Sequence, residues 1–220
     1  MTLSEMIKLA RRRSDDLVED YRISKAEYFD FANEAQDEAC RRSRLILDST
    51  TAAICQIALV SGTATYDLDD RVLFVRRVKL STITPVLARV SRKTLDVGAP
   101  DWETETGQPR GYVPDMEDGV LRPYPTPDAS YTAKLTVVRM PLVSMTDGDE
   151  EPEIRSRHHR MLVEWMLYRA YSKEDSEIYS PKKASECLAM FESEFGRRST
   201  AQDESWIERE HGYETDEGVY

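Results

Sequence analysis

Prolines and glycines concentrate in one stretch of this 220-residue sequence and exclude a continuous helix there. Residues 98–127 contain ten of them, ending with Pro123, Pro125 and Pro127. Proline lacks the backbone N–H that a helix interior or a central strand needs, so the stretch predicts turns, loops and edge strands. Long regular elements therefore have to come from the residues on either side.

Two helix-start signals open the sequence. Thr2 with Glu5, and Ser24 with Glu27, have the spacing of a capping box, in which each side chain bonds the backbone of the other residue. Apolar residues then recur at helical intervals, which predicts a short helix over residues 3–18 and a second of roughly 22 residues after Ser24. Acidic side chains early in the second segment and arginines late in it also match the helix dipole.

The middle of the chain has strand character. β-branched and aromatic residues are enriched in short runs, and the last run alternates between apolar and polar residues, as a half-buried strand does. Strands are expected within residues 52–60, 65–68, 72–80, 85–95, 120–122 and 131–140.

Helical periodicity returns after the acidic loop 147–151. One helix is expected from Pro152 to about Lys173, and another from Ser180 and Pro181 to the stop signal Gly196. The fold class predicted is α+β: a helical bundle of about four helices with an inserted antiparallel β domain and an extended C-terminal tail. The expected domains are residues 1–49 and 143–198 for the bundle, 50–142 for the β insertion and 199–220 for the tail.

Composition excludes several classes of protein. The formal net charge of -11 opposes binding to nucleic-acid phosphates, and 40% hydrophobic residues are enough for a folded core. Cys40, Cys55 and Cys187 are odd in number and lie in apolar patterns, so we expect reduced, buried thiols and assembly in a cytoplasm. No apolar run approaches the length of a membrane span, and neither secretion nor membrane insertion is expected.

The sequence gives no sign of an active site. His158 and His159 are adjacent and point about 100° apart on a helix, so we expect one to be packed and the other exposed. The acidic loop 147–151 lacks the continuation of a calcium-binding loop, and neither a nucleophile elbow nor a phosphate loop is present. We therefore predict a non-enzyme without catalytic residues, cofactor or metal.

Two arginine groups stand out on the predicted helices. Phosphate contact is one interpretation, and the favoured one is a solvated helix face that pairs with nearby carboxylates or with neighbouring subunits. The groups are Arg11, Arg12 and Arg13, near Asp15 and Asp16, and Arg41, Arg42 and Arg44, near Asp37 and Glu38.

The last twenty residues combine acidic side chains with aromatic ones. Aromatic side chains are the commonest anchors of protein interfaces, so we expect Trp206, Ile207, Tyr213 and Tyr220 to bind a partner. The alternative is a disordered, solubilising tail.

A carbohydrate-binding or hydrolytic module is an alternative for the β insertion. Trp102 would be the sugar platform, with Asp101, Glu103 and Glu105 as nearby carboxylates. Acidic residues are abundant in this chain, however, and no spacing selects a catalytic pair.

Several strings, in their order along the chain, resemble the head-to-tail adaptor (connector or neck) proteins of tailed bacteriophages. They cover most of residues 1–198, whereas the last 20 residues match no fixed pattern. The strings are residues 24–36, 38–42, 62–68, 107–112, 121–127, 139–142, 152–154, 158–165, 169–171 and 173–175.

This resemblance implies a structural virion protein that forms a homo-oligomeric ring, usually of twelve subunits, beneath the portal protein. The ring would continue the DNA channel without binding DNA specifically, and tail or nozzle proteins would dock on it. The implied location is the neck of the virion. A tail-completion or tail-terminator protein of similar build is the alternative.

Overall fold

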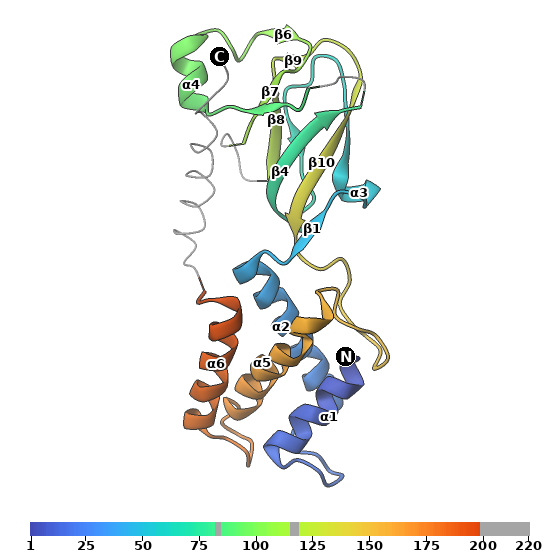
Figure 1. Cartoon of the computed structure of the whole chain (residues 1–220), viewed down its shortest axis with the longest axis vertical. Coiled ribbons are helices and arrows are strands. Elements are labelled where there is room, and N and C mark those ends of the chain that lie inside the picture. Colours follow the sequence, from blue (N-terminus) through green and yellow to red (C-terminus); the bar gives the residue numbers. More distant parts are fainter. Residues whose placement is uncertain (82–84, 115–118, 199–220) are drawn as a thin grey trace. The chain divides into compact units, whose positions relative to one another are not determined.

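The computed structural model describes residues 1–81, 85–114 and 119–198, and it confirms the α+β class. The chain divides into two compact units (Figure 1). We call them the helical unit, Met1–Ile46 with Met140–Arg198, and the β unit, which in the described residues is Leu47–Arg139.

The helical unit is built from two segments that are far apart in the sequence. α5 packs against the other three α-helices of the unit, and this central place explains why it buries consecutive residues from Leu162 to Leu167 rather than one stripe. The helices are α1 (Leu3–Ser14), α2 (Lys25–Ser43), the short 3-10 helix η1 (Ser156–His158), α5 (His159–Tyr171) and α6 (Pro181–Phe195).

One hydrophobic core joins these helices. Tyr28 on α2, Met166 on α5 and Phe191 on α6 are each fully buried in it. The Phe191 ring lies 4.9 Å from Trp165 and 4.6 Å from Phe195, measured between centroids. Burying a large apolar side chain contributes about 1.5–3 kcal/mol, so this shared core holds the two sequence segments together.

The helix-start signals are confirmed. Thr2 and Ser24 both form complete capping boxes with Glu5 and Glu27, and α6 begins with Pro181 and ends before Gly196. Two lengths were wrong. α1 ends at Ser14, short of residue 18, and α5 begins at His159 rather than after Pro152.

The late start of α5 has a local cause. The Glu153 N–H donates to the Gln36 side chain, and the Ile154 carbonyl lies 2.8 Å from His159 Nε2. Both backbone groups therefore have partners outside a helix. Because the Ile154 carbonyl faces the His159 ring instead of a backbone N–H one turn ahead, the regular helix forms only beyond it.

The β unit contains a four-stranded sheet around β10 (Tyr131–Arg139). β4 (Val72–Leu80) pairs with β10 along one edge, whereas β1 (Ile46–Asp48) and β2 (Gln56–Leu59) share the other edge. The pairing of β10 with β4 is antiparallel, with Leu135 opposite Val78, both buried. The strands predicted at 72–80 and 131–140 are thus confirmed.

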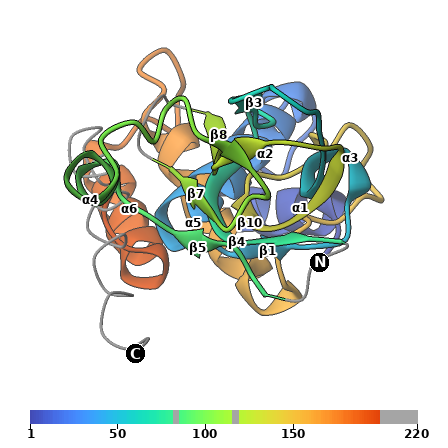
Figure 2. The ribbon, with the colours of Figure 1, turned by 90° about the horizontal axis from the view of Figure 1, so that it is seen from above.

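A second sheet has the order β3-β8-β7-β5, and Figure 2 shows β5, β7 and β8 together. Its β5–β7 pair is parallel, as is the separate β6–β9 pair, so the β insertion is mixed rather than antiparallel throughout. The strands are β3 (Tyr66–Asp67), β5 (Ala88–Arg89), β6 (Thr106–Gly107), β7 (Gly111–Val113), β8 (Val120–Tyr124) and β9 (Thr126–Pro127).

Two expected strands of the β unit contain helices instead. The run 52–60 begins with the one-turn helix α3 (Ala52–Cys55) before β2, and the run 85–95 gives way to α4 (Arg92–Gly98) after β5. Ser91 caps α4, because its hydroxyl accepts a hydrogen bond from the Thr94 N–H. This capping signal overrode the strand propensity of the preceding residues.

Candidate functional site: the loop between the first two helices

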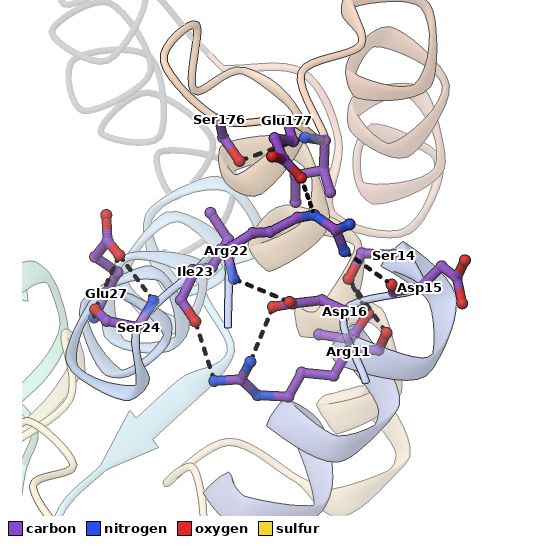
Figure 3. A network of polar contacts seen from close by, with 12 residues as sticks. Arg11, Ser14, Asp15, Asp16, Arg22, Ile23, Ser24, Glu27, Ser176 and Glu177 are labelled. Carbon is purple, nitrogen blue, oxygen red and sulfur yellow. Dashed lines mark hydrogen bonds and ion pairs between the residues drawn. The ribbon is translucent and has the colours of Figure 1, made fainter. Parts of the chain in front are cut away.

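A buried arginine organises the connection between α1 and α2, which we call the α1–α2 loop (residues 15–24; Figure 3). Arg11 Nη1 donates to Asp16 Oδ2 at 2.9 Å, and Arg11 Nη2 donates to the Ile23 carbonyl at 3.0 Å. The guanidinium carbon also lies 3.5 Å from the centroid of the Tyr21 ring. One side chain therefore binds the beginning and the end of the loop.

A second set of contacts closes the loop across its base. The Arg22 N–H donates to Asp16 Oδ1 at 3.0 Å, and the Arg22 guanidinium donates to the Asp15 carbonyl at 3.2 Å and to Glu177 at 2.9 Å. Glu177 belongs to the connection between α5 and α6. The hydrogen bond with Glu177 also raises the pKa of Arg22, so the guanidinium stays charged throughout the accessible pH range.

The backbone of the loop uses two left-handed residues. Asp15 ends α1 with φ 58°, and Asp20 has φ 71°. Aspartate adopts this conformation at lower cost than most residues because its short side chain can bond locally. The left-handed residue at Asp15 explains why α1 stops short of Leu17.

The same loop exposes three large apolar side chains. Leu17 is 58% exposed, Val18 is 80% exposed and Tyr21 is 45% exposed. Scattered apolar residues are common on protein surfaces, but three within five residues of a fixed loop form a local patch. We call Leu17, Val18 and Tyr21 the loop patch.

Carboxylates without an ion-pair partner lie next to the loop patch along the chain. In the part of the chain that the structure describes, Asp15, Glu19 and Asp20 have no lysine or arginine within ion-pair distance, whereas Asp16 pairs with Arg11. The loop thus presents an apolar surface with a negative rim. Its buried arginine bonds Asp16 and the Ile23 carbonyl and holds the loop in place, so the arrangement is suited to recognition.

The three arginines of the predicted group on α1 lie in three different environments. Arg11 is buried and holds the loop, Arg12 is exposed, and Arg13 forms a two-fold contact with the buried carboxylate of Glu164 on α5. The expected pairing with Asp16 is confirmed for Arg11, but the solvated face was wrong for this residue.

The group on α2 is also partly buried. Arg42 pairs with Glu38 at 2.9 Å and lies 5.1 Å from the Trp165 ring, with only 4% of its side chain exposed. Arg41 pairs more loosely with Glu38, at 3.8 Å. No pair with Asp37 is present among the described residues.

The histidines and cysteines behave as structural residues. His159 is buried against the Met1 amino group and the Ile154 carbonyl, whereas His158 lies beside Glu194 with 15% of its side chain exposed, less than the exposed position expected. All three cysteines are free and buried, as predicted. Within the described ranges, no group of three histidine, cysteine or acidic side chains could hold a metal ion.

The sugar-platform interpretation of Trp102 was wrong. Trp102 is 3% exposed, its ring packs edge-on against Tyr124, and its Nε1 donates to Asp96 at 2.9 Å. A buried ring offers no face on which a sugar could stack. Glu105 is occupied by hydrogen bonds with Tyr124 and Arg110.

The predicted anchors Trp206, Ile207, Tyr213 and Tyr220 lie outside the described residues. No helix in the described ranges is both long and apolar enough to cross a membrane. Sequence analysis missed the loop patch because Leu17 and Val18 continue the apolar periodicity of α1. The helix ends at the left-handed Asp15, and helical periodicity does not indicate where a helix ends.

The polar groups described above form contacts within the fold. Residues 1–211 match the family described as SU10 adaptor protein, and no curated protein matches the sequence. The chain belongs to the SU10 adaptor protein family. It is accordingly a phage structural adaptor, a virion component that assembles with other head or tail proteins.

Proposed function

We propose that this chain forms a ring of about twelve copies between the portal and the tail of a bacteriophage and continues the DNA channel. The observation that carries the proposal is the family match over residues 1–211, which covers both units. The sequence strings that resemble head-to-tail adaptors lie in the same region.

The proposal assigns a role to each part of the chain. Residues 1–49 and 143–198 form a four-helix bundle that makes the wall of the ring, and residues 50–142 offer strand edges and loops to tail or nozzle proteins. Residues 199–220 order on a partner, with the aromatic and aliphatic side chains as anchors. These anchors are Trp206, Ile207, Tyr213 and Tyr220.

Charge supports a channel through which DNA passes without being held. The formal net charge of each subunit is -11, and a ring of such subunits repels phosphates on average. Three buried thiols also suit assembly in the reducing cytoplasm of the host.

Electron microscopy of the purified chain mixed with portal rings tests the proposal. We expect an added ring of density with the symmetry of the portal on one of its faces. A chain lacking residues 201–220 should add this ring less completely. Density only on tail tubes, with bare portals, would instead make the chain a tail-completion protein.

A further inference from the structure

The loop patch is exposed on a backbone that has little freedom. Leu17 and Val18 lie between Asp15 and Asp20, whose left-handed conformations set the path of the chain. Arg11 and Arg22 bind both ends of the loop through the contacts described above. A loop already fixed in one conformation loses little entropy when it binds, which favours affinity.

The position of the loop within the helical unit leaves it accessible. It precedes the first residue of α2, whereas the chain leaves the unit at Ile46, just after the last residue of this helix. The 19 residues of α2 span about 28 Å at 1.5 Å per residue. Within the helical unit, the loop patch therefore lies about one helix length from Ile46.

The negative rim indicates the chemistry of the partner. Asp15, Glu19 and Asp20 are exposed carboxylates around apolar side chains, so the complementary surface has an apolar floor and lysine or arginine at its edge. The same loop of a second copy is a poor match, because both loops present exposed carboxylates at positions 15, 19 and 20.

We propose that the α1–α2 loop is a docking surface, and that its occupant is an apolar groove with a basic rim on the portal. This inference rests on the proposed function, which assigns the β unit to the phage tail proteins and so leaves the helical unit to the portal. Leu17 and Val18 enter the groove, and the carboxylates pair with its rim.

Binding of the purified chain to immobilised portal rings tests this inference. The double variant Leu17→Ser/Val18→Ser should bind about 30-fold more weakly, since truncated interface hot spots cost about 2 kcal/mol or more. The matched control is Val143→Ser, which changes a side chain that is 75% exposed in the same unit and should alter binding less than about 2-fold. Circular dichroism and thermal unfolding establish that each variant is folded.

A second variant tests the rim. Glu19→Gln/Asp20→Asn removes two charges and keeps a residue that tolerates the left-handed conformation at position 20. Portal binding by the wild type should weaken as sodium chloride rises, and this variant should show a smaller dependence on salt.

The outcomes separate the inference from the proposed function. A wild-type chain that does not bind portal rings contradicts the proposed function itself. Wild-type binding that the Leu17→Ser/Val18→Ser variant matches overturns the docking surface and leaves the adaptor intact. If the Leu17→Ser/Val18→Ser variant binds portal rings normally but no longer binds tail proteins or no longer self-associates, the loop is a docking surface whose occupant is not the portal.

Discussion

Each unit contains a loop tied down by a buried arginine–aspartate pair, and the two loops differ in what they expose. In the β unit, Arg139 Nε donates to Asp48 at 2.6 Å, and both side chains are about 5% exposed. The Asp48 carboxylate also accepts hydrogen bonds from the backbone and hydroxyl groups of Thr50 and Thr51. This pair closes a short polar turn between β1 and α3.

In the helical unit, the Asp16 carboxylate accepts from Arg11 and from the Arg22 N–H, across a loop that leaves Leu17 and Val18 in water. The Asp48 carboxylate accepts from more donors than the Asp16 carboxylate does, and the loop that it closes is shorter. Such a densely bonded pair contributes to stability. The helical-unit pair holds a longer loop with an apolar surface. The comparison separates a bond that closes a fold from one that also presents a binding surface.

The largest expected effect is on the β unit. Asp48→Ala removes the carboxylate that pairs with the buried Arg139 guanidinium and accepts from Thr50 and Thr51, and it should lower the free energy of unfolding by about 3–5 kcal/mol. Urea unfolding followed by circular dichroism measures the loss. Asp101→Ala, at an exposed position of the same unit, should change stability by less than about 0.5 kcal/mol. Equal losses for both variants would contradict the prediction.

The equivalent change in the helical unit should cost less. Arg11→Met keeps the apolar stem but leaves Asp16 unpaired, and it should destabilise the unit by about 2–3 kcal/mol, because the released loop can rehydrate the carboxylate. The same urea measurement checks it. Arg12→Met, at the exposed neighbouring position on α1, is the control. If Arg11→Met lowered the free energy of unfolding as much as Asp48→Ala does, the two pairs would not differ in their contribution to stability.

Low pH should weaken the Asp48–Arg139 pair and lower the free energy of unfolding of the β unit. Burial raises the pKa of Asp48, but hydrogen bonds from Thr51, Thr50 and Arg139 outweigh it and hold this pKa well below its usual range. The folded state then binds fewer protons than the unfolded state, so the stabilisation is complete above about pH 4 and is lost as pH falls below that.

Unfolding in urea between pH 7 and pH 3 measures this dependence. The effect should be smaller than that of Asp48→Ala, since a protonated carboxyl keeps part of its hydrogen bonding. Asp48→Asn should show a flatter profile over the same range. Parallel profiles for wild type and variant would show that other carboxylates govern the acid transition.

The smallest effect concerns the path of the α1–α2 loop. Asp20→Val places a β-branched residue at φ 71° and should cost about 1–2 kcal/mol, whereas Asp20→Asn should be nearly neutral. Thermal unfolding of the two variants checks the difference. Identical midpoints would indicate that the backbone at this position relaxes freely.

Local signals in the sequence predicted the elements that depend on local chemistry. The capping boxes of α1 and α2, the Pro181 start and Gly196 stop of α6, and the strand β10 follow from residues within each segment. The fold class followed because these signals surround a stretch rich in prolines and glycines.

What could not be predicted depends on residues distant in the sequence. Leu17 continues the apolar period of α1, but the left-handed Asp15 and the bonds of Arg11 to Asp16 and Ile23 show that the helix has already ended. Trp102 beside carboxylates resembles a sugar platform in the sequence, but it is buried and its ring packs against Tyr124 of β8, which lies 22 residues further along the chain. Neighbouring arginines on α1 likewise differ because each helical position faces another direction.

The division of the helical unit into two sequence segments sets an order of events during synthesis. α1 and α2 leave the ribosome before α5 and α6, but the core that contains Tyr28 is complete only after α5 and α6 have been made, beyond the whole β unit. The β unit can complete its own sheets in the interval, since domains fold as units while translation proceeds. The oldest helices of a newly made chain are therefore among the last to become native, and their apolar faces need protection until then.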